Sequence, residues 1–268
     1  PMPGGGRHGG RPDQIRALTV REIQDRLDRH YKPRNATLAL AGDFDPAAAR
    51  RMIEAHFAAP AAGEEIPPPR EPGAPRFAVA APANKGARAA ESIGEPTACL
   101  AYLAPRPGSA LYAPFLVLVS RLWSGASQLG GSGATGSPVF FTPLDDGSVV
   151  AISATFRPGE TQDQVFQRIE KFVAEATGPS LGADEPAAVK QRLGLLVGLG
   201  DLPDAALGLN PYGVAFSLAR RDQLGLDSAR LNRALESVTD ADLKRVVVEV
   251  FASSRHAGAV AGAGGAGR

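Results

Sequence analysis

Leu18-Thr19-Val20-Arg21-Glu22-Ile23 and Val238-Thr239-Asp240-Ala241-Asp242-Leu243 are two copies of one pattern. When residues 18–42 are laid without a gap on residues 238–262, an aromatic residue and a closing glycine also coincide. In both copies a threonine precedes a helical pattern, and an acidic residue follows three positions later, which is the arrangement of a capping box. The chain therefore contains an internal repeat, and each copy predicts a capped helix, a short polar turn and an apolar strand.

The two copies have unequal surroundings. In the first copy we expect a buried strand at residues 37–41, then a helix over residues 46–57 with Asp45 as its N-cap. In the second we expect a helix after Thr239 and a strand at residues 258–261. Most of the chain precedes the second copy, whereas little precedes the first, so the first copy predicts only the end of a domain.

A proline-rich stretch separates the copies and indicates a linker at residues 59–75. We therefore divide the chain into a remnant of a first domain at residues 1–58, the linker, a complete second domain at residues 76–262 and a flexible tail at residues 263–268.

The second domain shows strand patterns first and helical patterns later. Strands are expected at residues 77–81, 97–103, 139–142 and 148–156, and helices at residues 109–123, 161–176, 186–199, 211–224 and 228–235. The strands at 139–142 and 148–156 are separated by a turn and predict a hairpin. This order favours an α+β fold with an antiparallel-rich sheet and helices packed on one face.

Charge and hydropathy exclude several classes of partner. The chain of 268 residues has 29 basic and 28 acidic residues and a net charge of +1, so we expect no nucleic-acid partner. Its longest uninterrupted apolar run, residues 115–119, is too short to span a bilayer, so we expect no membrane partner. No signal-peptide pattern is present at the start.

The cysteine, the histidines and the glycine-rich loop of this sequence do not form a recognisable catalytic motif. The lone cysteine, Cys99, lies in an apolar run and is interpreted as an inert buried thiol. The histidines, His8, His30, His56 and His256, have no zincin spacing; His30 and His56 fall at helix ends and His256 in a turn. The glycine-rich loop at residues 125–136 lacks the lysine of a phosphate-binding loop.

The segment Tyr31-Lys-Pro-Arg-Asn35-Ala-Thr-Leu-Ala-Leu-Ala-Gly42-Asp-Phe-Asp45, followed by a helix ending at His56-Phe57, resembles the closing third of the catalytic domain of pitrilysin or insulinase-type (M16, M16B-like) zinc metallopeptidases. Residues 77–262 resemble the second, homologous domain of these enzymes. The resemblance implies the αβ sandwich of the mitochondrial processing peptidase, and a protein without membrane spans in the bacterial periplasm or the cytoplasm.

In that family a His-x-x-Glu-His motif and a distal glutamate bind zinc and activate water. This chain lacks the motif, so no catalytic residue and no metal ligand can be carried over. We expect no cofactor bound by this chain, and zinc in the missing catalytic half or in a partner. The family's second domain contacts the substrate backbone through an arginine and a tyrosine, which here implies Tyr212 with Arg220 or Arg221; a structural helix with solvated arginines is the alternative.

Two functions follow from this resemblance. The first is the C-terminal, non-metal-binding half of an M16-like zinc endopeptidase, which forms part of a peptide-binding chamber and has peptide as its substrate. The second is a non-catalytic M16-like subunit that acts by assembly with a catalytic or core partner, or with a second copy of itself. Whether the chain is itself an enzyme is left open. In either case we expect the apolar face of residues 1–58 to pack on the second domain or on another chain.

Overall fold

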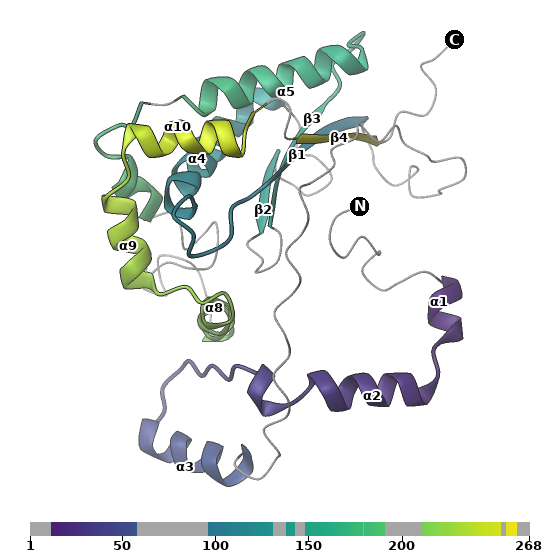
Figure 1. Ribbon diagram of the computed structural model, residues 1–268, viewed down its shortest axis with the longest axis vertical. Coiled ribbons are helices and arrows are strands. Elements are labelled where there is room, and N and C mark those ends of the chain that lie inside the picture. Colours follow the sequence, from purple (N-terminus) through teal and green to yellow (C-terminus); the bar gives the residue numbers. More distant parts are fainter. Residues whose placement is uncertain are drawn as a thin grey trace. The chain divides into compact units, whose positions relative to one another are not determined.

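A computed structural model describes residues 12–57, 96–130, 138–142, 148–178, 180–190, 211–252 and 256–261. The chain divides into two compact units (Figure 1). The first unit consists of Pro1–Pro72 and Pro203–Gln223, and the second of Gly73–Leu202 and Leu224–Arg268. The expected boundaries of the linker lie outside the described residues, so the division at residues 58 and 76 stays a prediction.

The first unit consists of short helices. They are α1 (Pro12–Ala17), α2 (Val20–His30), a 3-10 turn η1 (Pro33–Asn35), α3 (Pro46–Phe57) and α8 (Pro211–Gln223). Thr19 caps α2, because its hydroxyl accepts from the Glu22 amide while the Glu22 carboxylate accepts from the Thr19 amide at 2.8 Å. Asp45 caps α3 by accepting from the amide of Ala47 at 2.7 Å. The predicted starts of both helices are confirmed.

Residues 37–41 do not form the buried strand that their apolar pattern predicts. The segment has no assigned strand, and the side chains of Leu38 and Leu40 are exposed. A strand needs a neighbour for its amides and carbonyls, and among the described residues no strand pairs with this one. The Thr37 hydroxyl holds the segment by donating to a carboxylate oxygen of Asp222 in α8 at 2.7 Å.

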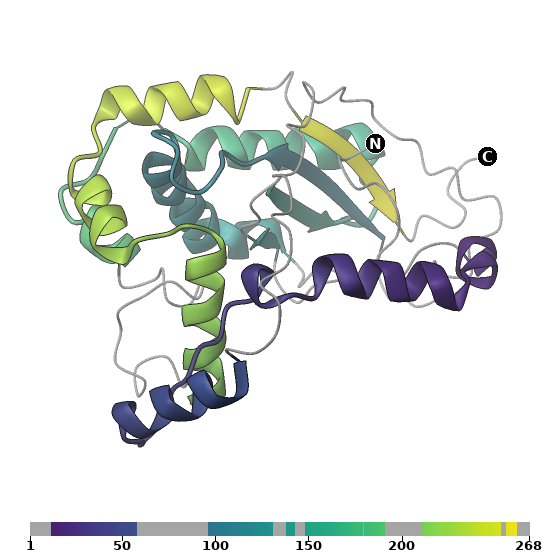
Figure 2. The same ribbon diagram turned by 60° about the horizontal axis from the view of Figure 1, so that its bottom comes forward.

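The second unit is built on a four-stranded antiparallel sheet (Figure 2). Its strands are β1 (Thr97–Leu103), β2 (Val139–Thr142), β3 (Val149–Thr155) and β4 (His256–Ala261), in the order β2-β3-β1-β4. β1 lies between β3 and β4, so that Leu100 faces Ile152 on one side and Gly258 on the other. The antiparallel β2–β3 pair confirms the predicted pairing, while the turn that joins them lies outside the described residues. β4 begins at His256, so this histidine opens a strand and does not lie in a turn.

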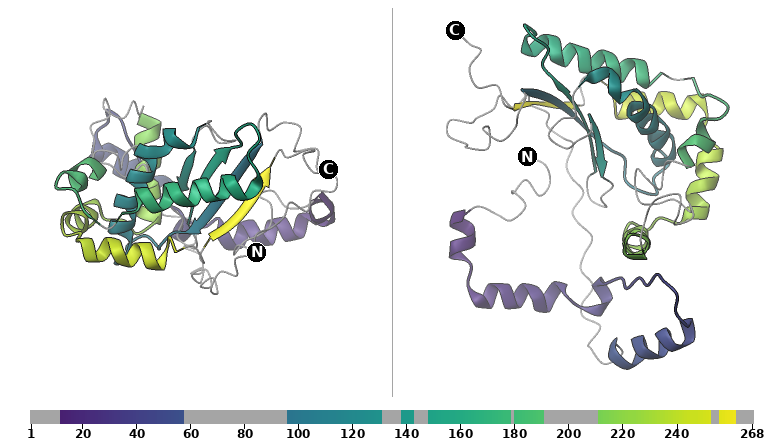
Figure 3. Two further views of the ribbon diagram at one scale, coloured as in Figure 1. Left: turned by 90° about the horizontal axis from the view of Figure 1, so that it is seen from above. Right: turned by 180° about the vertical axis from the view of Figure 1, so that it is seen from behind.

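Helices cover one face of this sheet, as the sequence predicts (Figure 3). α4 (Tyr112–Gly125), continued by the 3-10 turn η3 (Ala126–Leu129), packs on β2, and α5 (Gln162–Ala176) packs on β1 and β3. α9 (Ser228–Glu236) and α10 (Asp240–Glu249) pack on α4. Residues 185–190 are also helical. Alternate residues of β1 and β3 are buried, and Leu100 and Ile152 face each other across the pair, so one side of the sheet carries the core. The strand expected at residues 77–81 and the helix beyond residue 190 lie outside the described residues.

The core lies between α4 and the sheet. Phe115 of α4 sits 5.2 Å from the ring of Phe141 in β2 and 6.0 Å from that of Phe251, which in turn lies 5.3 Å from Tyr102 in β1. This aromatic cluster joins α4, the sheet and the end of α10. Every buried hydrophobic residue of the described core belongs to the second unit, so the described residues of the first unit contribute none.

Two arginines bind neighbouring loops to the helices of this core through ion pairs and hydrogen bonds. Arg168 of α5 binds both carboxylate oxygens of Glu160 and the carbonyls of Leu129 and Thr155. Arg121 of α4 pairs with Glu185 and also donates to the backbone carbonyls of Gly178 and Ser180, in the loop after α5. Because each planar guanidinium satisfies several acceptors at once, it fixes the loop geometry better than a lysine would.

Candidate functional site

The residues expected to contact substrate lie along α8 in the first unit. Tyr212 is exposed near the start of the helix and its ring stacks on that of Phe216, with centroids 6.4 Å apart. Arg220 and Arg221 lie in the last turn. An α-helix turns about 100° per residue, so Arg220 is about 80° from Tyr212 around the helix, whereas Arg221 is about 180° away. The helix therefore brings Tyr212 and Arg220 toward one side and places Arg221 on the opposite side.

Asp222 of α8 makes a contact that the sequence did not reveal. Its carboxylate accepts from Thr37, which is 185 positions away in the chain, and this hydrogen bond joins α8 to the segment after η1. No periodic pattern or motif could have indicated a contact between residues so distant in sequence. α8 thus groups with the helices of the first unit and not with the helices that cover the sheet.

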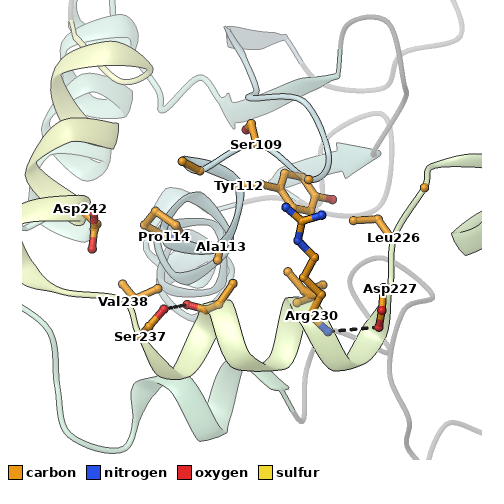
Figure 4. Close-up of a pocket in the computed structure, with 15 residues that line it drawn as sticks. Ser109, Tyr112, Ala113, Pro114, Leu226, Asp227, Arg230, Ser237, Val238 and Asp242 are labelled. Atoms are coloured by element: carbon orange, nitrogen blue, oxygen red, sulfur yellow. Dashed lines mark hydrogen bonds between the residues drawn. The ribbon is translucent and has the colours of Figure 1, made fainter.

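A pocket of about 370 Å³ opens in the second unit, where the loop before α4 meets α9 and α10 (Figure 4). Its polar side chains are Ser109, Tyr112, Asp227, Arg230, Ser237 and Asp242. The guanidinium of Arg230 extends from α9 toward the ring of Tyr112. Sequence reasoning missed this pocket because its walls come from separate segments that only the tertiary fold brings together.

The two carboxylates of the pocket already serve as helix caps. Asp227 accepts from the amides of Arg230 and Ala229, and these bonds lower the pKa of its carboxyl group. Asp242 accepts from the amide and hydroxyl of Thr239. The exposed guanidinium of Arg230 is left as the group best suited to a polar ligand such as a carbonyl or a carboxylate. No histidine or cysteine is among the described residues of the lining, so the pocket offers binding and no nucleophile paired with a base.

The histidines do not form a metal site in the part of the chain that the structure describes. His30 ends α2, His56 lies in the last turn of α3, and His256 opens β4 with its Nε2 atom 3.5 Å from the carboxylate of Glu170. Among the described residues, no group of three or more His, Cys, Asp or Glu could hold a metal ion. The residues present therefore do not fit the zinc of M16 peptidases, and His8 lies outside the described residues.

Cys99 is half-buried, and so less covered than its apolar run predicts. It lies on β1, and burial raises the pKa of its thiol, which disfavours the reactive thiolate.

The glycine-rich loop lies only partly within the described residues: η3 covers its first part, and residues 131–137 fall outside. Across the described segments, none of the helices has the length and apolar character needed to cross a membrane.

Solved structures share this fold at low sequence identity. The peptidase M16 inactive domain from Pseudomonas fluorescens matches with a TM-score of 0.69 and 17% identity, over 97% of this chain and 61% of that one. A protease from Helicobacter pylori matches with a TM-score of 0.63 and 17% identity, over 94% and 60%. A chain of Complex III2 from Candida albicans, solved with Inz-5 bound, matches with a TM-score of 0.59 and 12% identity, over 94% and 61%. The chain thus spans about 60% of the length of these structures.

Sequence comparison identifies the family more directly than these folds do. No relative was found among proteins with curated functions. Residues 17–185, more than half of the chain, match the family described as the peptidase M16 inactive domain. That match begins just before Leu18 and Thr19 of the first repeat copy and includes β1. The chain belongs to the peptidase M16 inactive-domain family.

Proposed function

We propose that this chain is the C-terminal, non-metal-binding half of an M16-like zinc endopeptidase and forms part of its peptide-binding chamber. The zinc and the catalytic residues are supplied by a second half, which this chain supports. One observation carries the proposal: the chain has an α/β core without a metal-ligand group in its described residues, and it also has a second copy of the repeat whose described apolar side chains are exposed.

The exposed side of α8 is the proposed peptide contact. Tyr212 offers an exposed ring and hydroxyl, and Arg220 lies two turns along toward the same side. An aromatic ring and a guanidinium can hold an extended peptide through its backbone carbonyls without selecting its sequence. We expect Tyr212→Ala and Arg220→Ala to raise KM about tenfold with little effect on kcat, and Arg221→Ala to leave both unchanged, because it lies on the opposite side.

Reconstitution tests the proposal. This chain alone, and the same chain in its natural complex or longer polypeptide, would be compared for zinc content by mass spectrometry and for hydrolysis of quenched fluorescent peptides. We expect zinc at about one equivalent and peptide hydrolysis only in the reconstituted form. A reconstituted form without either zinc or activity would contradict the proposal.

A second function has an observation of its own in its favour. The chain also resembles a chain of Complex III2, with a TM-score of 0.59 against 0.63 for the protease from Helicobacter pylori. It would then be a non-catalytic subunit that binds a core or catalytic partner through the exposed apolar side chains of α2 and the segment after it. Charged substitutions at those side chains would abolish assembly in this case, while no combination of chains would hydrolyse peptides.

A further inference from the structure

The walls of the pocket in the second unit are largely apolar. Four buried side chains contribute to them: Tyr112 and Ala113 from α4, Leu231 from α9, and Val238 from the segment between α9 and α10. The volume of about 370 Å³ lies at the lower end of the range for small-molecule sites. The pocket therefore suits a small, partly apolar ligand and is too small for a folded partner.

A positive charge lies on one side of this pocket. Arg230 is exposed, and its guanidinium extends from α9 toward the ring of Tyr112 (Figure 4). Among the described residues, no carboxylate lies within ion-pair distance of it. The carboxylate of Asp227 accepts instead from the backbone amides of Ala229 and Arg230, at 2.8 and 3.1 Å. The guanidinium thus keeps its donors for a ligand, and a carboxylate is the acceptor that matches its planar fork.

A negative charge lies on the opposite side of the pocket. Asp242 of α10 is part of the lining, and Figure 4 shows it across Pro114 from Arg230. Both hydrogen bonds that its side chain accepts from Thr239 use Oδ2. Its Oδ1 atom has no hydrogen bond to another residue that the structure describes. This second oxygen is therefore available to a cationic group of a ligand.

We propose that this pocket binds a short zwitterion with an apolar body, of the dipeptide type, with its carboxylate on Arg230 and its ammonium group on Asp242. A simple anion fits less well, because Asp227 and Asp242 place two negative charges around a single guanidinium. A wholly apolar ligand would take both charged ends of the pocket out of water without giving either a partner. The inference does not depend on the proposed peptide contact, since α8 belongs to the first unit and the pocket to the second.

Calorimetric titration of the 268-residue chain with three related probes tests this inference. Leucyl-leucine carries both charges, N-acetyl-leucyl-leucine lacks the ammonium group, and leucyl-leucinamide lacks the carboxylate. We expect leucyl-leucine to bind with a Kd of about 1 mM or below, and each blocked form to bind at least about tenfold more weakly. The comparison changes only the ligand, so it does not depend on the folding of a variant. Equal binding of the three forms, or no binding of leucyl-leucine, would overturn the inference.

Two arginine variants of α9 locate the binding within the protein. Arg230 and Arg233 lie on the same helix, but only Arg230 is part of the pocket lining. We expect Arg230→Gln to weaken the binding of leucyl-leucine at least about tenfold, and Arg233→Gln to leave it unchanged. For leucyl-leucinamide, which has no carboxylate, Arg230→Gln should make little difference. Equal losses in both variants would show that the net charge of α9 is responsible, and acetate that bound as tightly as the dipeptide would identify a simple anion site; either result would overturn the assignment.

Discussion

Arg168 shows how one side chain can hold several parts of the second unit. Its guanidinium joins α5 to the carboxylate of Glu160, to Leu129 at the end of η3 and to Thr155 at the end of β3. Both partners of the ion pair are largely shielded, with 14% of the Arg168 side chain and 11% of the Glu160 side chain exposed. An ion pair in this position is worth more than one on the open surface, because solvent screens it less.

We therefore expect Glu160→Gln to lower the free energy of unfolding of the second unit by about 2 kcal/mol, since it leaves a shielded guanidinium without its charge partner. Urea unfolding followed by the fluorescence of Trp123 would measure the change. Glu175→Gln is the matched control, because Glu175 pairs with Lys171 on the exposed side of the same helix, and it should cost less than about 0.5 kcal/mol. Equal effects of the two substitutions would contradict the assigned role of Glu160.

The same pair predicts how stability depends on pH. The hydrogen bond from Arg168 lowers the pKa of Glu160 from 4.5 to about 2. When folding lowers the pKa of a carboxyl group, the group contributes its full stabilisation at a pH above its pKa in the unfolded state. This contribution is lost as the pH falls through its pKa in the folded state. The difference in stability between wild type and Glu160→Gln should stay constant above about pH 5 and shrink as the pH approaches about 2. A difference that grew in acid would show that the sign of this coupling is wrong.

At the scale of elements, α2 and α10 show that a capped amphipathic helix can form without being stabilised by a core. Both have the capping box that the sequence predicts, yet α2 has no buried residue while α10 buries Leu243 and Val246. The strand segments that follow them differ in the same way. Local hydrogen bonds thus account for where each helix begins, and the neighbouring elements account for its stability.

Equivalent substitutions in these two helices should lower the free energy of unfolding by different amounts. Leu243→Ala removes a fully buried side chain, so we expect the free energy of unfolding to fall by about 3 kcal/mol. Ile23→Ala at the equivalent position of α2 should change it by less than about 0.5 kcal/mol in the 268-residue chain. Chemical denaturation of both variants measures the two changes in the free energy of unfolding. A large loss for Ile23→Ala would mean that α2 is packed more tightly than its exposure indicates.

At the scale of the whole molecule, the two units differ in how much apolar surface they remove from water. The second unit has a continuous core that runs from the sheet through α4 and α5 to α9 and α10, whereas no described residue of the first unit is part of this core. Because burial of apolar surface provides most of the free energy of folding, the units should differ in stability.

Hydrogen exchange should resolve this difference in the 268-residue chain. We expect amides of β1, α4, β3 and α5 to exchange only through global unfolding of the second unit, and amides of α2 and α3 to exchange orders of magnitude faster. Mass spectrometry of peptic fragments would measure both groups in one experiment. Amides of α2 protected to the same degree as those of α4 would contradict the view that the first unit is uncovered.

Much of this molecule could be read from short stretches of its sequence. The caps at Thr19, Asp45 and Thr239, the extent of α3 and the antiparallel strands all follow from interactions among residues a few positions apart or from simple alternation. The family resemblance rests on the same kind of local pattern and is confirmed by the match over residues 17–185.

Two features depended on the tertiary structure. Residues 36–41 and 256–261 occupy equivalent repeat positions, but only the second segment is a strand, because only it has β1 beside it to accept and donate hydrogen bonds. The pocket around Arg230 likewise arises where α4, α9 and α10 meet. A strand's partner and a pocket's walls come from residues far apart in the chain, and a local pattern holds no information about which of them will be present.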